Sequence, residues 1–307
     1  MSDDGIYFNP PPRSAHTPTA PSRPTPAPVE VSIDGRPVSV PTGATLLDAC
    51  SAAGVSTPTL CFASTLTPVN ACRVCVVELE GARTLVPACA RKAEPGMKVL
   101  TDSPRVRLSR KVVLELLGSS VDLSTAPDLL RWQQRYAARP ARFGSGAAVA
   151  TVAQQTKVKV DNALYVRDYG KCVLCYKCVE ACGTDAQHTF AIAVAGRGFH
   201  AHISTEADVP LPDSACVYCG NCIQVCPTGA LMFKTEHDLR AAGRWDPAAQ
   251  THTDTICPYC GVGCTLTLTV QEQRIVKVMS PPDAPVTRGN LCIKGRFGTT
   301  FVGPEDA

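Results

Sequence analysis

The chain has 307 residues, of which 45% are hydrophobic and 6% aromatic, and its formal net charge is +3. This length accommodates two or three small domains, and the low aromatic content argues against a single large core. A charge this small, spread along the chain, gives no indication of nucleic-acid binding. The sequence contains no run of eighteen or more apolar residues, so it predicts no membrane span.

The N-terminal segment, Met1–Pro12, is acidic and rich in proline, and it has neither an apolar stretch nor a twin-arginine pair. Because both kinds of export signal are missing from it, we expect a cytoplasmic location. In a reducing cytosol, regularly spaced cysteines indicate metal ligands before disulfides. Sixteen of the 17 cysteines form four groups of four, the ligand number of an iron–sulfur cluster, and only Cys50 is left over.

Residues 1–28 contain many prolines among Ser, Thr and Ala, a composition that predicts a disordered tail because it buries little apolar surface. Residues 29–104 are predicted as the first domain. Two alternating segments flank the turn Asp34-Gly35 and predict a β-hairpin. The segment Thr45–Ala53 predicts a short helix with a capping box, and Cys50 on its apolar face is interpreted as a core residue.

The first cysteine group follows this helix with the spacing C-x10-C-x2-C-x13-C, and a strand-like segment with Gly81 predicts a hairpin between its third and fourth members. A single C-x2-C pair is compatible with zinc or iron. The order of hairpin, helix and cysteine is that of a β-grasp ferredoxin, although the plant-type spacing is not met. The longer first gap resembles the N-terminal 2Fe-2S domain shared by the large iron–sulfur subunit of respiratory complex I, iron-only hydrogenases and NAD-linked formate dehydrogenases. This resemblance implies a 2Fe-2S cluster on Cys61, Cys72, Cys75 and Cys89.

Residues 105–160 are predicted to hold no cluster. Arg105–Leu117 predicts an amphipathic helix, and the rest is predicted to be partly helical and then a linker, with Trp132 and Tyr136 as packing anchors. In the families just named, this segment usually supplies one histidine and three cysteines to a further 4Fe-4S cluster. Neither residue type occurs between Cys89 and Cys172, so that cluster is expected to be absent. The apolar side of the helix is predicted to comprise Val106, Val112, Val113, Leu116 and Leu117, with the basic residues elsewhere.

Residues 161–240 contain an internal repeat, because the run C-x2-C-x2-C-x3-C that starts at Cys172 recurs forty-four residues later at Cys216. Two such runs are typical of a bacterial ferredoxin with two 4Fe-4S clusters, in which the fourth cysteine of each run ligates the other cluster. Zinc is disfavoured because structural zinc usually takes two separated pairs. His188, His200 and His202 in the insert are interpreted as ordinary strand or loop residues. The expected ligand sets are Cys172, Cys175, Cys178 with Cys226, and Cys216, Cys219, Cys222 with Cys182.

Residues 250–302 carry the last group, Cys257, Cys260, Cys264 and Cys292, with the spacing C-x2-C-x3-C-x27-C. This segment resembles the N-terminal 4Fe-4S domain of molybdopterin oxidoreductases, especially the cytoplasmic formate dehydrogenases. The resemblance implies a 4Fe-4S cluster beside a pterin cofactor, with Lys294 as an electron relay between the two. The alternative interpretation of Lys294 is a solvated loop cation. No G-x-G-x-x-G motif follows a strand, so no nicotinamide site is visible.

Together these segments predict an α+β multidomain fold that contains a β-grasp 2Fe-2S ferredoxin, a two-cluster 4Fe-4S ferredoxin and a small C-terminal molybdopterin-oxidoreductase 4Fe-4S domain. The resemblance covers about residues 29–302 and implies one 2Fe-2S and three 4Fe-4S clusters. The family's molybdenum or tungsten ligand, its catalytic residues and most of its pterin contacts come from further residues. We therefore expect no catalytic residue here, the molybdopterin cofactor on one partner chain and the flavin on another.

The resulting hypothesis is an electron-transfer subunit of a split NAD-dependent formate dehydrogenase. Electrons from a pterin metal site on the partner are expected to pass the C-terminal cluster, the two ferredoxin clusters and the 2Fe-2S cluster, and to reach a flavoprotein that reduces NAD. One alternative is the iron–sulfur diaphorase subunit of an NAD-linked hydrogenase or a complex I relative, against which the C-terminal group argues. The other is a non-catalytic truncated product or an iron–sulfur sensor, against which the intact cysteines argue.

Overall fold

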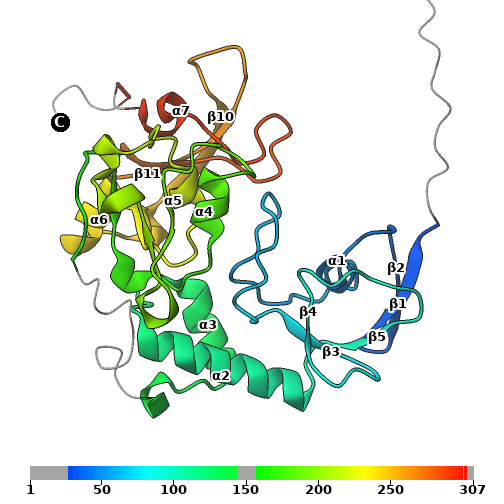
Figure 1. Cartoon of the computed structure of the whole chain (residues 1–307). Helices are drawn as coiled ribbons and strands as arrows, with labels where there is room; N and C mark the ends of the chain where they lie inside the picture. The colour runs from blue at the N-terminus through cyan, green and yellow to red at the C-terminus, as the bar shows by residue number, and fades with distance from the viewer. Residues whose placement is uncertain (1–26, 144–156, 300, 303–307) are drawn as a thin grey trace, which may run out of the picture.

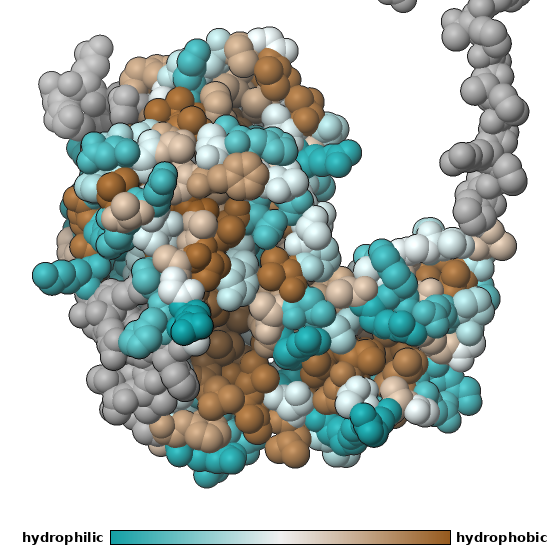
Figure 2. All heavy atoms as spheres, in the orientation of Figure 1, coloured by the Kyte–Doolittle hydropathy of each residue, from teal (hydrophilic) through white to brown (hydrophobic). Residues whose placement is uncertain are grey.

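The computed structural model describes residues 27–143, 157–299 and 301–302. Most of the segment predicted as a disordered tail, and part of the predicted linker, lie outside the described residues. The described part forms two lobes, with β1 to β5 and α1 in one and α4 to α7 in the other (Figure 1). Figure 2 shows a notch between the lobes at the top of the view and apolar side chains gathered where the lobes join below. In the part of the chain that the structure describes, no helix is long and apolar enough to cross a membrane.

The first lobe is built on a five-stranded sheet with the strand order β2-β1-β5-β3-β4. β1 (Val29–Ile33) and β2 (Arg36–Val40) pair antiparallel and confirm the predicted hairpin. β5 (Lys98–Leu100) runs parallel to β1 and antiparallel to β3 (Val76–Leu79). β3 also pairs antiparallel with β4 (Val86–Pro87), which confirms the hairpin expected between the third and fourth cysteines of the first group.

The short helix α1 (Leu46–Ala52) packs on this sheet. The Thr45 hydroxyl accepts a hydrogen bond from the backbone N–H of Asp48 at 3.2 Å, and the Asp48 carboxylate accepts one from the backbone N–H of Thr45 at 2.7 Å. This reciprocal pair is the predicted capping box, which satisfies two N–H groups that the helix itself leaves unpaired. Cys50 is fully buried in the core beside Ile33, as interpreted from the sequence.

The long helix α2 (Pro104–Ser120) confirms the predicted helix, but its predicted apolar side is partly wrong. Leu116 is 47% exposed, whereas the polar residues Arg110 and Glu115 are buried. Arg110 is satisfied by two backbone carbonyls and a tyrosine hydroxyl, and the Glu115 carboxylate accepts the backbone N–H of Arg139 at 3.0 Å. Because buried polar groups are tolerated when they are hydrogen-bonded, hydrophobic periodicity alone did not identify the inner face.

α3 (Pro127–Arg135) and a 3-10 turn (Pro140–Phe143) follow, so the segment after α2 is partly helical as predicted. Tyr136 is buried and Trp132 is partly buried, which confirms both as packing anchors. Together with a loop of the first lobe, this segment forms a separate hydrophobic core made of Leu60, Val74, Leu123, Ala126 and Leu129.

In the second lobe, the domain of residues 161–240 contains two short antiparallel strand pairs. β6 (Tyr165–Arg167) pairs with β9 (Leu231–Phe233), and β7 (Ala193–Ala195) pairs with β8 (His202–Ser204). His202 lies in a strand and His200 in a 3-10 turn, as interpreted. The helices of this domain are α4 (Lys177–Cys182), α5 (Asn221–Val225) and α6 (Lys234–Ala241).

The C-terminal domain is a three-stranded antiparallel sheet with α7 (Ile293–Phe297) beside it. The strands are β10 (Thr251–Ile256), β11 (Thr265–Gln271) and β12 (Arg274–Met279), and β11 confirms the predicted strand. Leu266 and Val278 pack against the cysteines of the last group in a small core. Each core includes or contacts at least one cysteine.

Replacing Thr45 by Ala removes the capping box and is expected to destabilise α1 by about 1 kcal/mol. Hydrogen exchange of the α1 amides should accelerate roughly fivefold, because 1 kcal/mol corresponds to that factor in an opening equilibrium. Ser51→Ala, at an exposed position of the same helix, is the matched control and should leave these rates unchanged. Equal rates in the two variants would show that the box does not stabilise the helix.

Candidate iron–sulfur cluster sites

The two cysteine runs of the second lobe enclose two cavities, and each cavity is lined by cysteines of both runs. The first three cysteines of one run share a cavity with the last cysteine of the other. This is the crossed combination that the repeat predicts. We name ferredoxin site 1 the set Cys172, Cys175, Cys178 and Cys226, and ferredoxin site 2 the set Cys182, Cys216, Cys219 and Cys222.

The two runs adopt the same backbone conformation at corresponding positions. Leu174 and Tyr218 have φ of 51° and 56°, and Tyr176 and Gly220 have φ of 64° and 69°. These left-handed residues turn backbone amides toward sulfur: the N–H of Leu174 donates to Cys172 Sγ at 3.4 Å, and the N–H of Tyr218 donates to its own run's first cysteine at 3.4 Å. Successive amides that face a concave loop form an anion-binding arrangement, which suits thiolates and cluster sulfides.

The donor chemistry of both ferredoxin sites fits iron. Burial raises the pKa of Cys178 and of Cys222 well above the usual thiol value, so a cation is needed to stabilise the thiolate form at neutral pH. Apolar residues such as Ile192 and Leu231 complete the cavity walls. Among the described residues, no three His, Cys, Asp or Glu side chains converge closely enough to hold a single metal ion. The cysteines surround cavities instead.

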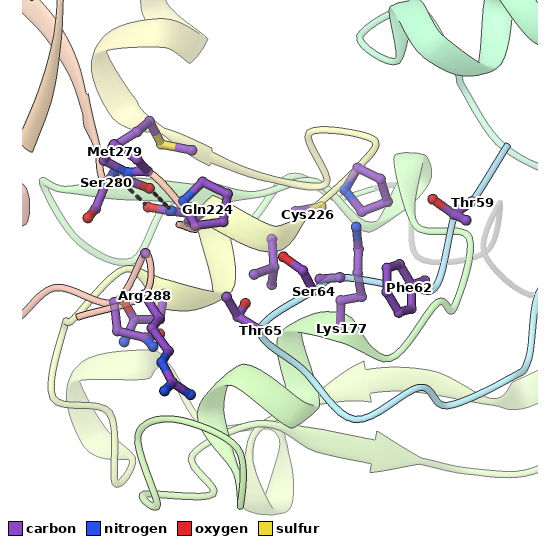
Figure 3. Close-up of a pocket in the computed structure, with 18 of the residues that line it drawn as sticks. Thr59, Phe62, Ser64, Thr65, Lys177, Gln224, Cys226, Met279, Ser280 and Arg288 are labelled. Atoms are coloured by element: carbon purple, nitrogen blue, oxygen red, sulfur yellow. Dashed lines mark hydrogen bonds between the residues drawn. The ribbon is translucent and has the colours of Figure 1, made fainter. Parts of the chain in front are cut away.

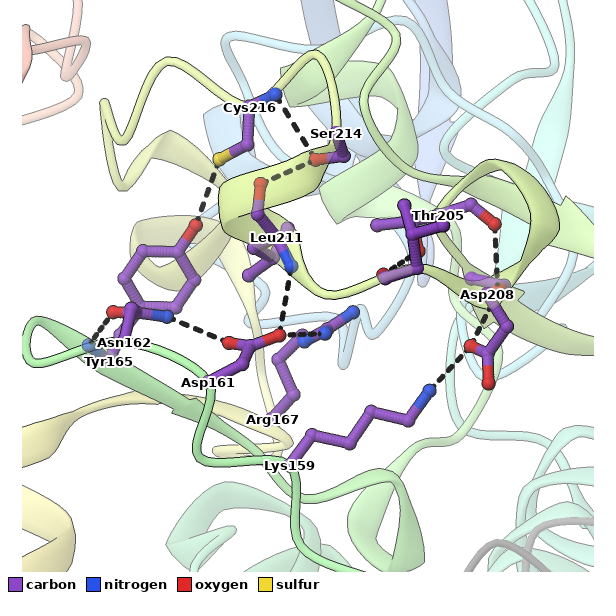
Figure 4. Close-up of polar contacts among 12 residues, drawn as sticks. Lys159, Asp161, Asn162, Tyr165, Arg167, Thr205, Asp208, Leu211, Ser214 and Cys216 are labelled. Atoms are coloured by element: carbon purple, nitrogen blue, oxygen red, sulfur yellow. Dashed lines mark hydrogen bonds and ion pairs between the residues drawn. The ribbon is translucent and has the colours of Figure 1, made fainter.

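A polar network supports ferredoxin site 2 from the side of β6 (Figure 4). The Tyr165 hydroxyl lies 3.1 Å from Cys216 Sγ. Arg167 pairs with the Asp161 carboxylate, which also accepts the backbone N–H of Leu211 at 2.9 Å. The strand and the loop before the second cysteine run are thereby fastened together next to the cysteines.

The first cysteine group forms two close pairs, which we name together the N-terminal site. Cys75 and Cys89 have their Sγ atoms 3.4 Å apart, and the backbone N–H of Cys72 donates to Cys61 Sγ at 3.5 Å. Hydrogen bonding by Cys72 lowers the pKa of Cys61 to about 5. Arg73, with φ of 57°, turns the chain between the two central cysteines. Two pairs of thiols, three of them buried and that of Cys72 partly buried, match the ligand requirement of a two-iron cluster.

The last group, named the C-terminal site, is half open to solvent. Cys257 and Cys264 are buried, and Cys260 and Cys292 are exposed. Cys257 and Cys264 pack in one core, where the backbone N–H of Cys257 donates to the carbonyl of Cys264 at 2.8 Å. Burial, followed by repulsion from the other thiols of the group, raises the pKa of Cys264. Lys294 is exposed on α7, a position that is compatible with both of its interpretations.

The N-terminal site lies next to ferredoxin site 1. Cys72 and Val173, the residue after Cys172, pack against the same hydrophobic core. The loop after Cys61 is fastened to the second lobe, because the backbone N–H and the hydroxyl of Thr67 donate to the Asp185 carboxylate at 2.6 and 2.9 Å.

The helix α7 joins ferredoxin site 2 to the C-terminal site. A Cβ at Gly295 would lie 3.5 Å from Cys257 Sγ, so the helix passes directly over that sulfur. On the opposite side, Arg296 Nε donates to the backbone carbonyl of Cys219 at 3.3 Å. The four sites therefore follow one another through the protein.

Three arginines are the largest fully buried side chains, and none of them stood out in the sequence as a functional residue. Arg110 Nε and Nη2 donate to the carbonyls of Val74 and Val76, on either side of Cys75. Arg167 lines ferredoxin site 2. Burial lowers the pKa of Arg296 to about 10, so its guanidinium stays charged at neutral pH.

Of these three arginines, only Arg110 occupies a position from which the sequence could have predicted burial. Arg110 falls four residues after Val106 and four before Leu114, which places it on the inner face of α2. Arg296 lies in a short glycine-containing helix, where periodicity gives no information.

A cavity of about 620 Å³ lies where the domains meet, next to Cys226 of ferredoxin site 1 (Figure 3). Phe62 comes from the first lobe, Lys177 and Gln224 from the ferredoxin helices, and Arg288 from the C-terminal domain. Gln224 Nε2 donates to the Ser280 carbonyl at 2.5 Å, and the backbone N–H of Ser280 donates to Gln224 Oε1 at 3.1 Å. These two hydrogen bonds fix the C-terminal domain to α5.

Three segments match known domain families. Residues 26–104 match the "2Fe-2S iron-sulfur cluster binding domain", residues 171–230 match the "4Fe-4S dicluster domain", and residues 250–303 match the "Molybdopterin oxidoreductase Fe4S4 domain". The predicted α+β multidomain organisation is thereby confirmed. The chain contains one 2Fe-2S domain and two kinds of 4Fe-4S domain.

The relatives that match most of this chain are much longer proteins. The chain is 33% identical over 294 residues to "NADPH-Fe(3+) oxidoreductase subunit alpha" of Geobacter sulfurreducens, and 32% identical over 286 residues to a subunit of an NADH-quinone oxidoreductase of Rhizobium meliloti. Each match covers 91% of this chain and 32% of the relative. A "Putative formate dehydrogenase" of Staphylococcus haemolyticus is 25% identical, with coverage of 90% and 31%. The chain thus spans about a third of the length of these relatives.

A solved structure has a similar fold. It is a chain of an NAD+-reducing NiFe hydrogenase in the H2-reduced state, with a TM-score of 0.58 and 26% identity. The match covers 67% of this chain and 87% of that chain. The chain is therefore an iron–sulfur protein that is similar, over most of its length, to segments of these oxidoreductase subunits.

Replacing Gly220 by Ala is expected to destabilise the protein more than replacing Gly243 by Ala. Both glycines have positive φ, 69° and 67°, so alanine costs about 1–2 kcal/mol at either position. Only at Gly220 would the new Cβ collide, at 2.9 Å from Arg296 Cγ and 3.1 Å from Phe297 Cζ. Thermal unfolding and iron content of the anaerobically purified variants measure the difference. Equal losses would contradict the packing of α7 on this loop.

Proposed function

We propose that this chain transfers electrons between a pterin-bound molybdenum or tungsten site on a partner polypeptide and a flavoprotein that reduces NAD, as part of an NAD-dependent formate dehydrogenase. The N-terminal site would hold a 2Fe-2S cluster, and ferredoxin site 1, ferredoxin site 2 and the C-terminal site would each hold a 4Fe-4S cluster. Bound clusters accept and donate single electrons. The chain's own residues hold, space and shield these centres.

The observation that carries this proposal is the serial adjacency of the four cysteine sites. Cys72 and Val173 pack against one core, the two ferredoxin sites exchange their fourth cysteines, and α7 contacts both Cys219 and Cys257. Electron transfer between buried centres needs short separations, and this chain of contacts favours them. The flavoprotein is proposed to bind the first lobe, at the end of the series opposite the C-terminal site.

The surface around the C-terminal site supports a partner at that end. Cys260 and Cys292 are exposed, and Lys294 is exposed beside them. Several exposed apolar residues in one small domain are typical of a protein interface. We propose that the pterin-binding partner docks here, with Lys294 as the electron relay between its cofactor and the cluster. The exposed apolar residues are Ile256, Tyr259, Val262 and Ile293, at 59%, 39%, 54% and 41% exposure.

A second candidate is the iron–sulfur diaphorase subunit of an NAD-linked hydrogenase. The similar fold of the hydrogenase chain, of which 87% is covered, favours it. The match of residues 250–303 to a molybdopterin oxidoreductase domain favours the formate dehydrogenase instead. The electron donor that reduces the clusters distinguishes the two candidates.

Crossed ligation predicts how cysteine variants group. The anaerobically purified chain should contain about 14 iron atoms, from one two-iron and three four-iron clusters. Cys226→Ser should perturb the same paramagnetic resonance signal as Cys172→Ser, and Cys182→Ser the same signal as Cys216→Ser. Cys50→Ser is the control and should leave iron content and all signals unchanged. Crossed ligation would be wrong if Cys226→Ser grouped with Cys216→Ser.

Co-purification tests the function. A tagged chain isolated anaerobically from its own host should bring down a molybdopterin polypeptide, and formate should reduce its clusters. Reduction by hydrogen, with a nickel–iron partner, would support the second candidate, and reduction by neither donor would contradict both. In the complex, Cys292→Ser should stop reduction by formate while NADH or NADPH still reduces the N-terminal site. Equal loss from both donors would contradict the proposed order.

A further inference from the structure

Arg296 is a buried cation whose partners are all neutral. Its side chain is 1% exposed. The guanidinium donates to the carbonyls of Cys219 and Val278 at 3.3 and 3.0 Å, and to the side-chain oxygens of Asn221 and Gln224 at 3.1 and 2.5 Å. These acceptors satisfy its N–H groups, but none of them carries a compensating charge.

A buried charge without a counter-charge is expensive. Desolvation of an ion costs several kcal/mol even after the protein relaxes, and neutral hydrogen bonds offset only part of that cost. The neighbouring buried Arg167 has the Asp161 carboxylate as its partner. Arg296 therefore needs an anion that its protein surroundings do not supply.

The 4Fe-4S cluster proposed for ferredoxin site 2 would supply this anion. A 4Fe-4S cluster with four thiolate ligands carries net negative charge, and Cys219, whose carbonyl receives Arg296 Nε, lines that cavity together with Gly220. The aliphatic part of Arg296 packs on the same loop, because a Cβ at Gly220 would lie 2.9 Å from Arg296 Cγ.

The helix that carries Arg296 is itself held firmly in place. Phe297, the next residue, stacks on Tyr165 with ring centroids 6.0 Å apart and contacts Phe233 at 5.5 Å. Asn221 Oδ1 accepts from Arg296 and also from the backbone N–H of Leu291 at 3.0 Å. The charge is therefore fixed between ferredoxin site 2 and the C-terminal site.

We propose that Arg296 is a positioning and tuning residue that supplies the buried counter-charge for the cluster at ferredoxin site 2 and raises its reduction potential. Each one-electron reduction adds one negative charge to the cluster, and a fixed cation in a low-dielectric interior favours the more negative state. The electron comes from the C-terminal site in the complex, or from added dithionite in a redox titration. This proposal rests on the cluster ligation set out in the proposed function.

Redox titration of the anaerobically purified full chain, followed by paramagnetic resonance, tests the proposal. Cys182→Ser identifies the signal of ferredoxin site 2. Arg296→Gln should lower the equilibrium constant for its reduction by about tenfold or more, which is about 59 mV toward more negative potential for one electron. Arg296→Lys, which keeps the charge, should have a reduction potential close to that of the unmodified chain. Arg240→Gln, whose arginine is already paired with Glu236, is the matched control and should not move this potential.

An unchanged potential in Arg296→Gln with full iron content would overturn the proposal, as would equal shifts in the Gln and Lys variants. If Arg296→Gln does not load the cluster, Asn221→Asp provides a second test, because Asp keeps both hydrogen bonds that Asn221 accepts and places a carboxylate against the guanidinium. It should also lower the potential, and an unchanged value would overturn the proposal. Because dithionite replaces the partner, a failure of formate to reduce the complex would count against the proposed function and leave this proposal standing.

Discussion

The exchange of cysteines between two short helices governs the arrangement of the elements around them. Cys182 ends α4 and Cys226 follows α5, and each reaches the cavity built mainly by the other run. Both cavities can be complete only if the two runs lie side by side. The paired strands β6 and β9, and the loops that lead into each run, are arranged to meet this requirement.

The same exchange explains how a chain with few aromatic residues holds several domains together. Each hydrophobic core is small, and cysteines form part of three of them and pack against the fourth. Buried thiols such as Cys178 and Cys222 favour the protonated form, whereas ligation requires thiolates. Metal binding and folding are coupled in such sites, because the metal supplies the free energy that gathers and deprotonates the ligands.

Buried arginine side chains lie next to the cysteine sites. Arg110 is buried beside the N-terminal site, and Arg167 and Arg296 are buried beside ferredoxin site 2, although an isolated cation is costly in an ordinary core. Apolar side chains of α2 and α3 form one core with Leu60 and Val74 of the first lobe, and Cys72 and Val173 pack against it. This core therefore connects the N-terminal site with ferredoxin site 1.

The local elements and the ligand groups could be predicted from the sequence alone. The hairpin around Asp34-Gly35, the capping box at Thr45 and the internal repeat all depend on short-range backbone chemistry or on spacing, which a sequence states directly. The crossed grouping of the ferredoxin cysteines also followed, because the repeated spacing is typical of bacterial ferredoxins in which the fourth cysteine of each run belongs to the other cluster.

The identity of the buried polar residues, and the order of the sites in space, became visible only in the folded chain. Hydrophobic periodicity assigned Leu116 to the inner side of α2 and its basic residues elsewhere, yet Arg110 and Glu115 are inside because backbone groups distant in sequence satisfy them. Arg296 is buried by contacts with Cys219 and Gln224, more than seventy residues earlier in the chain. Such burial depends on partners brought together by folding, and no local pattern records those partners.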